Sequence, residues 1–327
     1  MRYRIVGLVA GVALLTAGAI TVLPTSPAQA AYPGHDGKVA YVVASPGGTS
    51  HDIWTVNPDG SGNRRITHDG KSWHPRWSPD GKLLAFERNK DVYIMTPTGT
   101  LVRRVTTTGR AHQPTWSANG KRISFVNVLA NGHGDIYTVA TTGGAITRVT
   151  HDAATTCGDD RPSWSPLGTT VVYHQTTNTG SGCTHKRILL VTLSSGAERV
   201  VIEDGGIGPD VPVTDPDFMA DGQHVLFMAK CFDLGDCFSQ SFNPVVVDLN
   251  GANPRFLDHS DGTEGDYRSY ETAGAPDGQH AVVAALTWPG DPPVDSFLFD
   301  PFVRTTIVSV DQASVGTITQ PDWQPLP

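Results

Sequence analysis

The sequence lacks the short motifs that identify common enzyme classes. It contains no Gly-x-Ser-x-Gly turn for a nucleophilic serine, no His-Glu-x-x-His zinc motif, no Gly-x-x-x-x-Gly-Lys phosphate loop and no Gly-x-Gly-x-x-Gly dinucleotide fingerprint. A catalytic site assembled from distant segments would leave no such motif, so these absences do not exclude catalysis. They favour a protein that binds rather than catalyses.

Basic residues are outnumbered by acidic ones. The chain has 24 Lys and Arg against 32 Asp and Glu, a formal net charge of -8. Two of the basic residues, Arg2 and Arg4, lie in an N-terminal segment that we expect to be removed, which leaves 22 against 32, or about -10. Such a surface repels phosphate backbones, and no basic stripe with interleaved aromatic residues is present. Nucleic acid is therefore not an expected partner.

Long apolar runs are absent except near the N-terminus. Arg2 and Arg4 precede an uncharged run over residues 5–23, and Ala28-Gln29-Ala30 supplies the small residues that signal peptidase requires. We therefore expect a signal peptide over residues 1–30 and an exported domain over residues 31–327. An uncleaved membrane anchor is the alternative, but no basic cluster follows the run. No cysteine stands at the cleavage site to carry a lipid, so we expect a secreted or cell-envelope protein without membrane insertion.

Cysteine is scarce, and all four cysteines lie in the part that we expect to be exported: Cys157, Cys183, Cys231 and Cys237. An oxidising compartment permits disulfides, and four cysteines allow three pairings. We favour Cys157 with Cys183 and Cys231 with Cys237, because the second pair closes a short loop and the first links segments that flank one repeat. A tetrahedral zinc site is the alternative, but the local spacings differ from those of zinc motifs.

The sequence does have an internal repeat. Six near-copies of one phrase are present: HPRWSPDGKLLAF (74–86), QPTWSANGKRISF (113–125), RPSWSPLGTTVVY (161–173), DPDFMADGQHVLF (215–227), ETAGAPDGQHAVV (271–283) and a truncated QPDWQPLP (320–327). The part missing from the last copy stands near the N-terminus, where residues 36–41 read as a turn and a second strand. Repeats of this period indicate a repeat architecture, and joining the last copy to the first closes a ring.

One repeat contains four short strands. Around Trp77 we expect strands over residues 75–78, 82–87, 91–95 and 101–106, separated by tight turns. Four antiparallel strands in about forty residues make one propeller blade. Because six sets of strands account for the exported chain, we predict an all-β fold, a six-bladed β-propeller of four-stranded antiparallel blades, closed by pairing of the N- and C-terminal segments.

The repeated aromatic residues have a structural interpretation. Trp77, Trp116, Trp164 and Trp323, with Phe218 at the same position, are expected to pack between neighbouring blades rather than to stack on a ligand. Gly274 replaces this aromatic residue in the fifth copy, so the blade boundaries are least certain there. The Asp residues of the Asp-Gly pairs are expected to be turn residues.

Long connections gather on one side of the predicted ring. They comprise residues 151–160, 174–186, 202–214, 228–243, 258–270 and 285–294, and they contain all four cysteines. On the same side, the residues just before each first strand should surround the mouth of the central channel. These candidate binding residues are His74, His112, Gln113, Asp160, Arg161, Asp215, Tyr270, Glu271 and Gln320. Their mixed polar chemistry suits a polar ligand, although a water-filled polar channel is the usual condition of propellers.

One connection is rich in carboxylates. Five acidic residues stand within 14 positions: Asp258, Asp261, Glu264, Asp266 and Glu271. Hard cations such as calcium take oxygen ligands of this kind, which makes Asp261, Glu264 and Asp266 candidate cation ligands. The spacing matches no known calcium loop, so we expect a solvated acidic loop and no cofactor, with calcium as the alternative.

The chain resembles a known repeat at the WSPDG-like phrases, at the third strands of the DIYTV type and at the RVT segments that follow. It is similar to the TolB-type propeller repeat, a WD-like unit of the C-terminal domain of the translocation protein TolB, over residues 33–327. The resemblance implies a six-bladed propeller but no particular activity. TolB carries an α/β domain ahead of its propeller, and we expect the propeller alone here, because Ala31 lies close to the first expected strand.

We therefore expect a secreted, non-enzymatic binding module, a monomer that presents its loop-rich face to a protein, peptide or glycan. The alternative is an extracellular lyase or hydrolase with a metal-assisted site at the channel mouth. The similar oligogalacturonate lyases bind a metal through histidines there. His74 and His112 occupy comparable places, but no residue can be aligned to that site.

Overall fold

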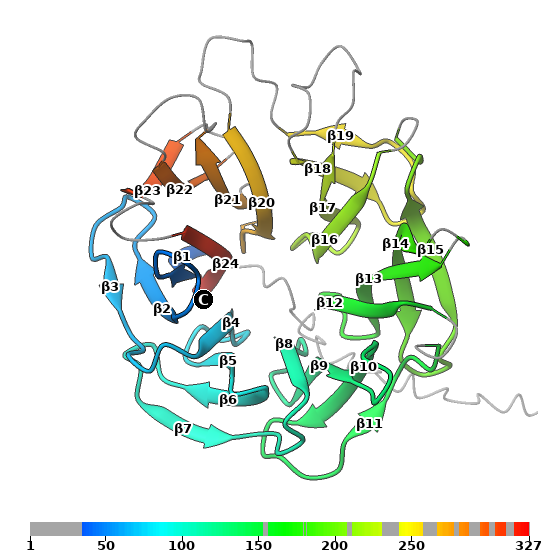
Figure 1. Ribbon diagram of the computed structural model, residues 1–327, viewed down its shortest axis with the longest axis horizontal. Helices are drawn as coiled ribbons and strands as arrows, with labels where there is room; N and C mark the ends of the chain where they lie inside the picture. The colour runs from blue at the N-terminus through cyan, green and yellow to red at the C-terminus, as the bar shows by residue number, and fades with distance from the viewer. Residues whose placement is uncertain are drawn as a thin grey trace, which may run out of the picture.

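The protein is built from β-strands arranged in a ring of sheets around a central axis (Figure 1). The computed structural model describes residues 35–152, 156–178, 180, 182–207, 211–230, 242–257, 267–277, 281–287, 295–300, 305–311 and 317–326. In this part of the chain, no helix has the length and apolar character needed to span a membrane.

Four sheets contain four antiparallel strands each. The first blade joins β24 (Thr317–Leu326), β1 (His35–Ala44), β2 (His51–Val56) and β3 (Arg64–Arg65). The second blade contains β4 (Ser72–Trp77), β5 (Leu84–Arg88), β6 (Asp91–Met95) and β7 (Leu101–Arg104). The third blade contains β8 (Ala111–Trp116), β9 (Arg122–Val128), β10 (Gly134–Ala140) and β11 (Thr147–Arg148). The fourth blade contains β12 (Gly158–Trp164), β13 (Thr170–Asn178), β14 (Cys183–Thr192) and β15 (Glu198–Glu203).

The fifth sheet contains eight strands. It comprises β16 (Val213–Phe218), β17 (His224–Lys230), β18 (Phe242–Asp248), β19 (Arg255–Phe256), β20 (Tyr267–Gly274), β21 (Ala281–Thr287), β22 (Asp295–Asp300) and β23 (Thr305–Asp311). The described structure thus has five sheets where the sequence predicts six separate blades. The difference arises because β18 pairs with β20 through a single residue pair, Phe242 with Ser269, which links two sets of strands.

The ring closes by pairing the two ends of the described chain. β24 lies antiparallel to β1, with Val39 opposite Trp323 and Ala40 opposite Asp322, and the two strands lie side by side in Figure 1. The side chain of Gln324 strengthens this pairing by accepting the backbone N–H of Lys38 at 3.1 Å. Closure by the C-terminal segment, which the sequence predicts, is confirmed, and it leaves no unpaired edge on β1.

The repeated tryptophans fill the junctions between blades. Trp77, Trp116, Trp164 and Trp323 are each 5% exposed or less. Trp77 packs with Val42 of the preceding blade, and the other three occupy equivalent apolar clusters. At Gly274 the residue that follows β16 fills the space, because Sδ of Met219 lies 3.4 Å from where a Cβ would stand. The packing interpretation of the tryptophans is confirmed.

The third and fourth strands of a blade are locked by a repeated polar cluster. In the first blade, Nη2 of Arg65 donates to Asp52 at 2.6 Å, and Oγ1 of Thr67 donates to Asp52 at 3.0 Å. The same contacts join Arg104 and Thr106 to Asp91 at 2.6 and 2.8 Å in the second blade. The buried aspartates therefore have a structural role, because they anchor the short outer strands.

The Asp-Gly pairs that begin at Asp80 and Asp221 form tight turns, as predicted, whereas the pair that begins at Asp36 lies within β1, where Asp36 is opposite Pro325, so the turn prediction was wrong there. Oδ1 of Asp80 accepts the backbone N–H of Lys82 at 3.2 Å and the hydroxyl of Ser78 at 2.7 Å. Asp221 accepts the backbone N–H of Gln223 at 2.8 Å in the same way. These side chains are therefore used to shape turns at the end of the blade opposite to the start of the first strand.

Candidate functional site

Five of the inner strands, β4, β8, β12, β16 and β24, contain a bulge at an X-Pro pair. The residues before proline are His74, Gln113, Arg161, Asp215 and Gln320, and all five have positive φ angles between 47° and 56°. The pairing register shifts by one residue at each of these places. Proline has no N–H for the ladder, and a bulge is one of the few places where a strand accepts it.

The bulges lie inside the first strands rather than before them. The sequence analysis places the mouth residues just ahead of strands that begin near Pro75, whereas β4 begins at Ser72. This prediction of the strand boundary was wrong, because an X-Pro pair reads as a strand start but is here accommodated by the extra residue of the bulge. A left-handed conformation is costly for a residue with a Cβ, so it persists only where the surroundings impose it.

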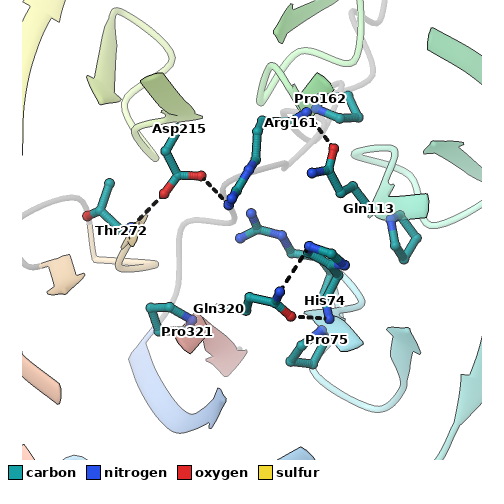
Figure 2. A pocket seen from close by; sticks show the side chains of 11 residues that line it. His74, Pro75, Gln113, Arg161, Pro162, Asp215, Thr272, Gln320 and Pro321 are labelled. Atoms are coloured by element: carbon teal, nitrogen blue, oxygen red, sulfur yellow. Dashed lines mark hydrogen bonds and ion pairs between the residues drawn. The ribbon is translucent and has the colours of Figure 1, made fainter. Parts of the chain in front are cut away.

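Hydrogen bonds between neighbouring inner strands accompany this conformation. Three side chains on the ring accept a backbone N–H from the neighbouring inner strand: Gln320 from His74 at 2.6 Å, Gln113 from Arg161 at 2.8 Å and Asp215 from Thr272 at 2.9 Å. Figure 2 shows these contacts around the axis. The mouth is therefore held by side chain to backbone bonds that cross blade junctions.

A second tier of contacts lies two residues further along the same strands. Here too, a side chain accepts a backbone N–H from the next first strand: Asp322 from Trp77 at 2.6 Å, Ser163 from Phe218 at 3.3 Å and Asp217 from Gly274 at 3.1 Å. Burial raises the pKa of Asp322 to about 6, although the nearby Arg76 opposes this effect. The two tiers together connect neighbouring inner strands around the axis.

A narrow pocket opens between these bulges at the axis. Its lining comprises His74, Pro75, Arg76, Gln113, Pro114, Arg161, Pro162, Asp215, Thr272, Gln320 and Pro321. Inside it, Nη1 of Arg161 lies 2.7 Å from Oδ1 of Asp215 (Figure 2). The proline rings give the wall apolar area, while the residue before each proline supplies a hydrogen-bonding group. The pocket thus offers donors and acceptors of both charges to one ligand.

A buried glutamate organises the histidines beside the pocket. Glu87 is 7% exposed, and its carboxylate binds Nδ1 of His74 at 3.1 Å and Nδ1 of His112 at 2.9 Å. Burial would raise the pKa of Glu87, but the hydrogen bonds and charges of His112 and His74 outweigh it and lower the pKa to about 2. Because Nε2 of Gln320 also lies 3.0 Å from Nε2 of His74, neutral His74 carries its proton on Nδ1.

The structure brings five of the nine candidate residues into the pocket: His74, Gln113, Arg161, Asp215 and Gln320. His112 lies beside it on Glu87, and Asp160 binds Nδ1 of His174 at 2.7 Å instead of lining it. Tyr270 and Glu271 belong to β20, but their side chains lie outside the described residues.

Sequence reasoning missed Arg76, Thr272 and the prolines of the lining, and it missed Glu87. The proline that follows each candidate in five of the six repeated phrases was the signal that could have located the bulges. Glu87 and Thr272 had no comparable signal, because β5 and the fifth repeated phrase give no pattern that points to the axis.

A disulfide pins the connections on the same side as the mouth. Cys157 and Cys183 are bonded with their Cα atoms 5.7 Å apart, as predicted. The bond joins the starts of β12 and β14, and the backbone N–H of Cys157 also bonds to Thr176 on the intervening β13 at 2.8 Å. Cys231, Cys237, Asp261, Glu264 and Asp266 lie outside the described residues. A disulfide among the described residues fits an oxidising compartment.

The expected loop over residues 174–186 is largely a hairpin. β13 continues to Asn178 and β14 begins at Cys183, with Thr176 opposite Lys186. The loop prediction was therefore wrong for most of this segment, because its threonines and charged residues form an extended two-stranded ladder. The extension stands above the fourth blade, next to the disulfide.

Comparison with known proteins identifies the repeat. The family model of the TolB beta propeller domain matches residues 16–200, more than half of the chain. The chain belongs to the TolB β-propeller family. No curated protein matches it.

Solved structures share the fold at low sequence identity. TolB from Acinetobacter baumannii is similar with a TM-score of 0.63 and 20% identity, over 88% of this chain and 67% of that one. A chain of a nidogen/laminin complex has a TM-score of 0.62 and 8% identity, over 88% and 98%. Kuenenia stuttgartiensis hydrazine synthase has a TM-score of 0.67 and 13% identity, over 94% of this chain and 50% of that one. At such identities the likeness shows the fold alone.

Proposed function

We propose that this protein is a secreted, non-enzymatic binding module, a monomeric six-bladed propeller that presents its axial mouth and the surrounding loops to a protein, peptide or glycan. The observation that carries this proposal is the ring of bulges. The backbone has the same unusual conformation at five positions, while the side chains are imidazole, amide, guanidinium and carboxylate. The bulge occurs with several different side chains, so the polar groups around the mouth can differ from strand to strand and give it a mixed lining suited to recognition.

The six-blade count is part of the proposal. The strands β16–β19 and β20–β23 follow the same antiparallel order as the separate four-stranded sheets. One residue pair joins the two sets, against six pairs in the β1–β2 ladder. We therefore treat the eight-stranded sheet as two blades in contact.

Export is supported by two observations. The N-terminal sequence has the charge, apolar run and small residues of a signal peptide over residues 1–30. The bond between Cys157 and Cys183 is the kind of cross-link that persists in oxidising compartments. Residues 31–327 would then be the mature propeller, and its loop-rich face would meet extracellular or cell-envelope ligands.

The contacts of the histidines bear on the enzymatic alternative. Nδ1 of His74 and Nδ1 of His112 both bind Glu87. Within the described ranges, the cluster of three or more potential metal ligands lies elsewhere, at Asp135, Asp152 and Asp159. A structural clamp on the two histidines favours a binding surface over a metal-assisted active site.

The test is a comparison of capture by matched variants. The mature chain is crosslinked to proteins and glycans from an extracellular extract, alongside Arg161→Gln at the mouth and Lys82→Gln on the opposite turn, where the Lys82 side chain is 79% exposed. Both variants lose one positive charge. We expect the wild type and Lys82→Gln to capture the same ligand and Arg161→Gln to lose it.

Equal capture by all three proteins would contradict binding at the mouth. Bound metal in the purified protein, together with turnover that is lost in His74→Gln or His112→Gln, would instead support the lyase or hydrolase.

A further inference from the structure

Three successive blade junctions can be compared position by position. Each has a buried aspartate at the start of a third strand, namely Asp52, Asp91 and Asp135, and each of these binds an arginine of the fourth strand. Two further positions lie beside this aspartate. The first position lies two residues after the threonine of the fourth-strand segment, which is Thr67, Thr106 or Thr150. The second position lies two residues before the residue that precedes the bulge proline, which is His74, Gln113 or Arg161.

At the first junction these positions are electrically balanced. They hold Asp69 and Ser72, and Ser72 donates to Asp69 at 2.9 Å. Arg88, which lies opposite Ser72 on β5, forms an ion pair with Asp69. Two carboxylates, Asp52 and Asp69, are thus matched by two guanidinium groups, Arg65 and Arg88.

At the second junction the same positions are uncharged. They hold Thr108 and Ala111, and Asn127 lies opposite Ala111 on β9. The pair Asp91 and Arg104 is therefore again balanced.

The third junction carries an excess of negative charge. The equivalent positions hold Asp152 and Asp159, and the place of Arg88 is taken by the neutral Gln175, which lies opposite Asp159. Its amide Nε2 donates to Asp152 at 2.5 Å and to Asp159 at 3.0 Å. With Asp135 there are three carboxylates, and Arg148 is the guanidinium bound directly to one of them.

The three carboxylates converge on one point. One oxygen from each of Asp135, Asp152 and Asp159 lies within 4.8 Å of the other two. Asp159 is 1% exposed, and Gln175 and Thr150 hydrogen-bond to its carboxylate, but its Oδ2 is buried and has no hydrogen-bond partner among the described residues. A buried carboxylate oxygen without a donor is costly unless something compensates its charge.

We propose that Asp135, Asp152 and Asp159 bind one hard divalent cation of the calcium class between the third and fourth blades. Calcium accepts carboxylate oxygens at about 2.3–2.6 Å, so two oxygens on one ion lie up to about 5 Å apart, which this cluster satisfies. Carboxylates are the ligands that such ions prefer over softer metals. The ion would supply the counter-charge that Arg88 supplies at the first junction.

The position of the site indicates what the ion does. Asp152 belongs to the connection between the third and fourth blades, and Asp159 lies two residues after the disulfide-bonded Cys157. An ion held there would fasten the fourth blade to the third at the loop-rich end of their junction, and it would add to the constraint of the disulfide. The proposal is independent of which ligand the mouth binds.

A proton is the competing counter-charge. Burial, together with the charges of Asp152 and Asp135, raises the pKa of Asp159 to about 8, so an ion-free cluster would retain a proton near neutral pH. The two possibilities differ in whether stability responds to a metal ion.

The experiment uses the full mature chain after treatment with EDTA. Calcium chloride is titrated by calorimetry, and the melting temperature is measured with and without the ion. We expect one bound calcium per chain and a rise in melting temperature of several degrees, because an ion that binds the folded state stabilises it. Asp159→Asn should weaken binding by about 10-fold or more and remove the thermal shift.

Two controls locate the ion. Asp69→Asn makes the same change at the first junction and should leave calcium binding unchanged. The triple variant Asp261→Asn, Glu264→Gln, Asp266→Asn removes the acidic loop and should also retain the shift. If Asp159→Asn fails to fold, the less buried Asp152→Asn makes the same test.

The proposal is overturned if the wild type shows neither calcium binding nor a thermal shift, which would leave the proton as the counter-charge. It is also overturned if calcium binding survives in the folded Asp159→Asn or Asp152→Asn protein, or disappears in the acidic-loop variant alone.

Discussion

The backbone N–H of His74 donates to the side-chain oxygen of Gln320 at 2.6 Å, across 246 positions of sequence. The bond joins the second blade to the strand that closes the ring, and it has the same form as the bond from Arg161 to Gln113 between interior blades. The closing junction is therefore built like an ordinary junction.

Removing this acceptor should destabilise the closed ring. Gln320→Leu leaves the N–H of His74 without its partner, and we expect a loss of about 1–3 kcal/mol in the free energy of unfolding. Gln113→Leu should cost a similar amount, because it removes the equivalent bond. The measurement is urea unfolding, with the exposed Gln223→Leu as a control that should change little. A loss at Gln113 without one at Gln320 would show that the bond between His74 and Gln320 contributes little to stability.

The hydrogen bonds that join Glu87 to His74 and His112 should make the free energy of unfolding depend on pH in the acid range. The pKa of Glu87 is lowered from 4.5 to about 2 in the folded protein. A lowered carboxylate pKa stabilises the fold above the unfolded-state pKa, and this stabilisation is lost as the pH falls from about 5 towards 2. Glu87→Gln should therefore flatten the fall in stability over this range, by about 3 kcal/mol at most.

The measurement is urea unfolding at a series of pH values. Glu203→Gln, at an exposed carboxylate, is the control and should follow the wild type. An unchanged acid profile in Glu87→Gln would show that the histidines do not hold the carboxylate in its charged form.

The disulfide should stabilise the fourth blade by limiting the unfolded chain. Cys157 and Cys183 are 26 positions apart, and a loop of this size corresponds to about 3.5 kcal/mol in the chain-entropy treatment. The double variant Cys157→Ser, Cys183→Ser should lose about that amount in thermal or urea unfolding. Reductant should destabilise the wild type more than this variant. Equal sensitivity to reductant in both would assign the effect to other cysteines.

A close contact between the second blade and the closing strand should make one turn intolerant of substitution. Gly81 has φ +65°, and an added Cβ would lie 2.1 Å from the carbonyl oxygen of Pro325. Gly47 has φ +84° and nothing within 4 Å of the same point. Gly47→Ala should cost only the backbone strain of about 1–2 kcal/mol, whereas Gly81→Ala should cost clearly more. Equal losses in urea unfolding would show that the turn moves freely away from β24.

The sequence predicted the structural features that the repeats share and missed those in which one repeat differs from the others. The phrases around Trp77 and Trp323 predicted the blades, their aromatic packing and the pairing of β24 with β1, because each depends on a local pattern used several times. The prediction of six separate sheets missed the pairing of Phe242 with Ser269, which involves two strand ends and has no local pattern.

The candidate site was predicted by position but not by conformation. The residues before proline were chosen because topology brings the first strands to the axis. Their left-handed backbone was not predictable, because proline normally favours an extended conformation in the residue before it. The grouping of Asp135, Asp152 and Asp159 was also out of reach, since their convergence depends on the packing of two blades.

Because the first blade needs β24 to be complete, it can form only late in synthesis. Until residues 317–326 have left the ribosome, β1 has no neighbour on its inner side and exposes a row of free backbone groups. Such an edge is prone to pair with another chain, so the nascent protein is vulnerable until its last strand arrives.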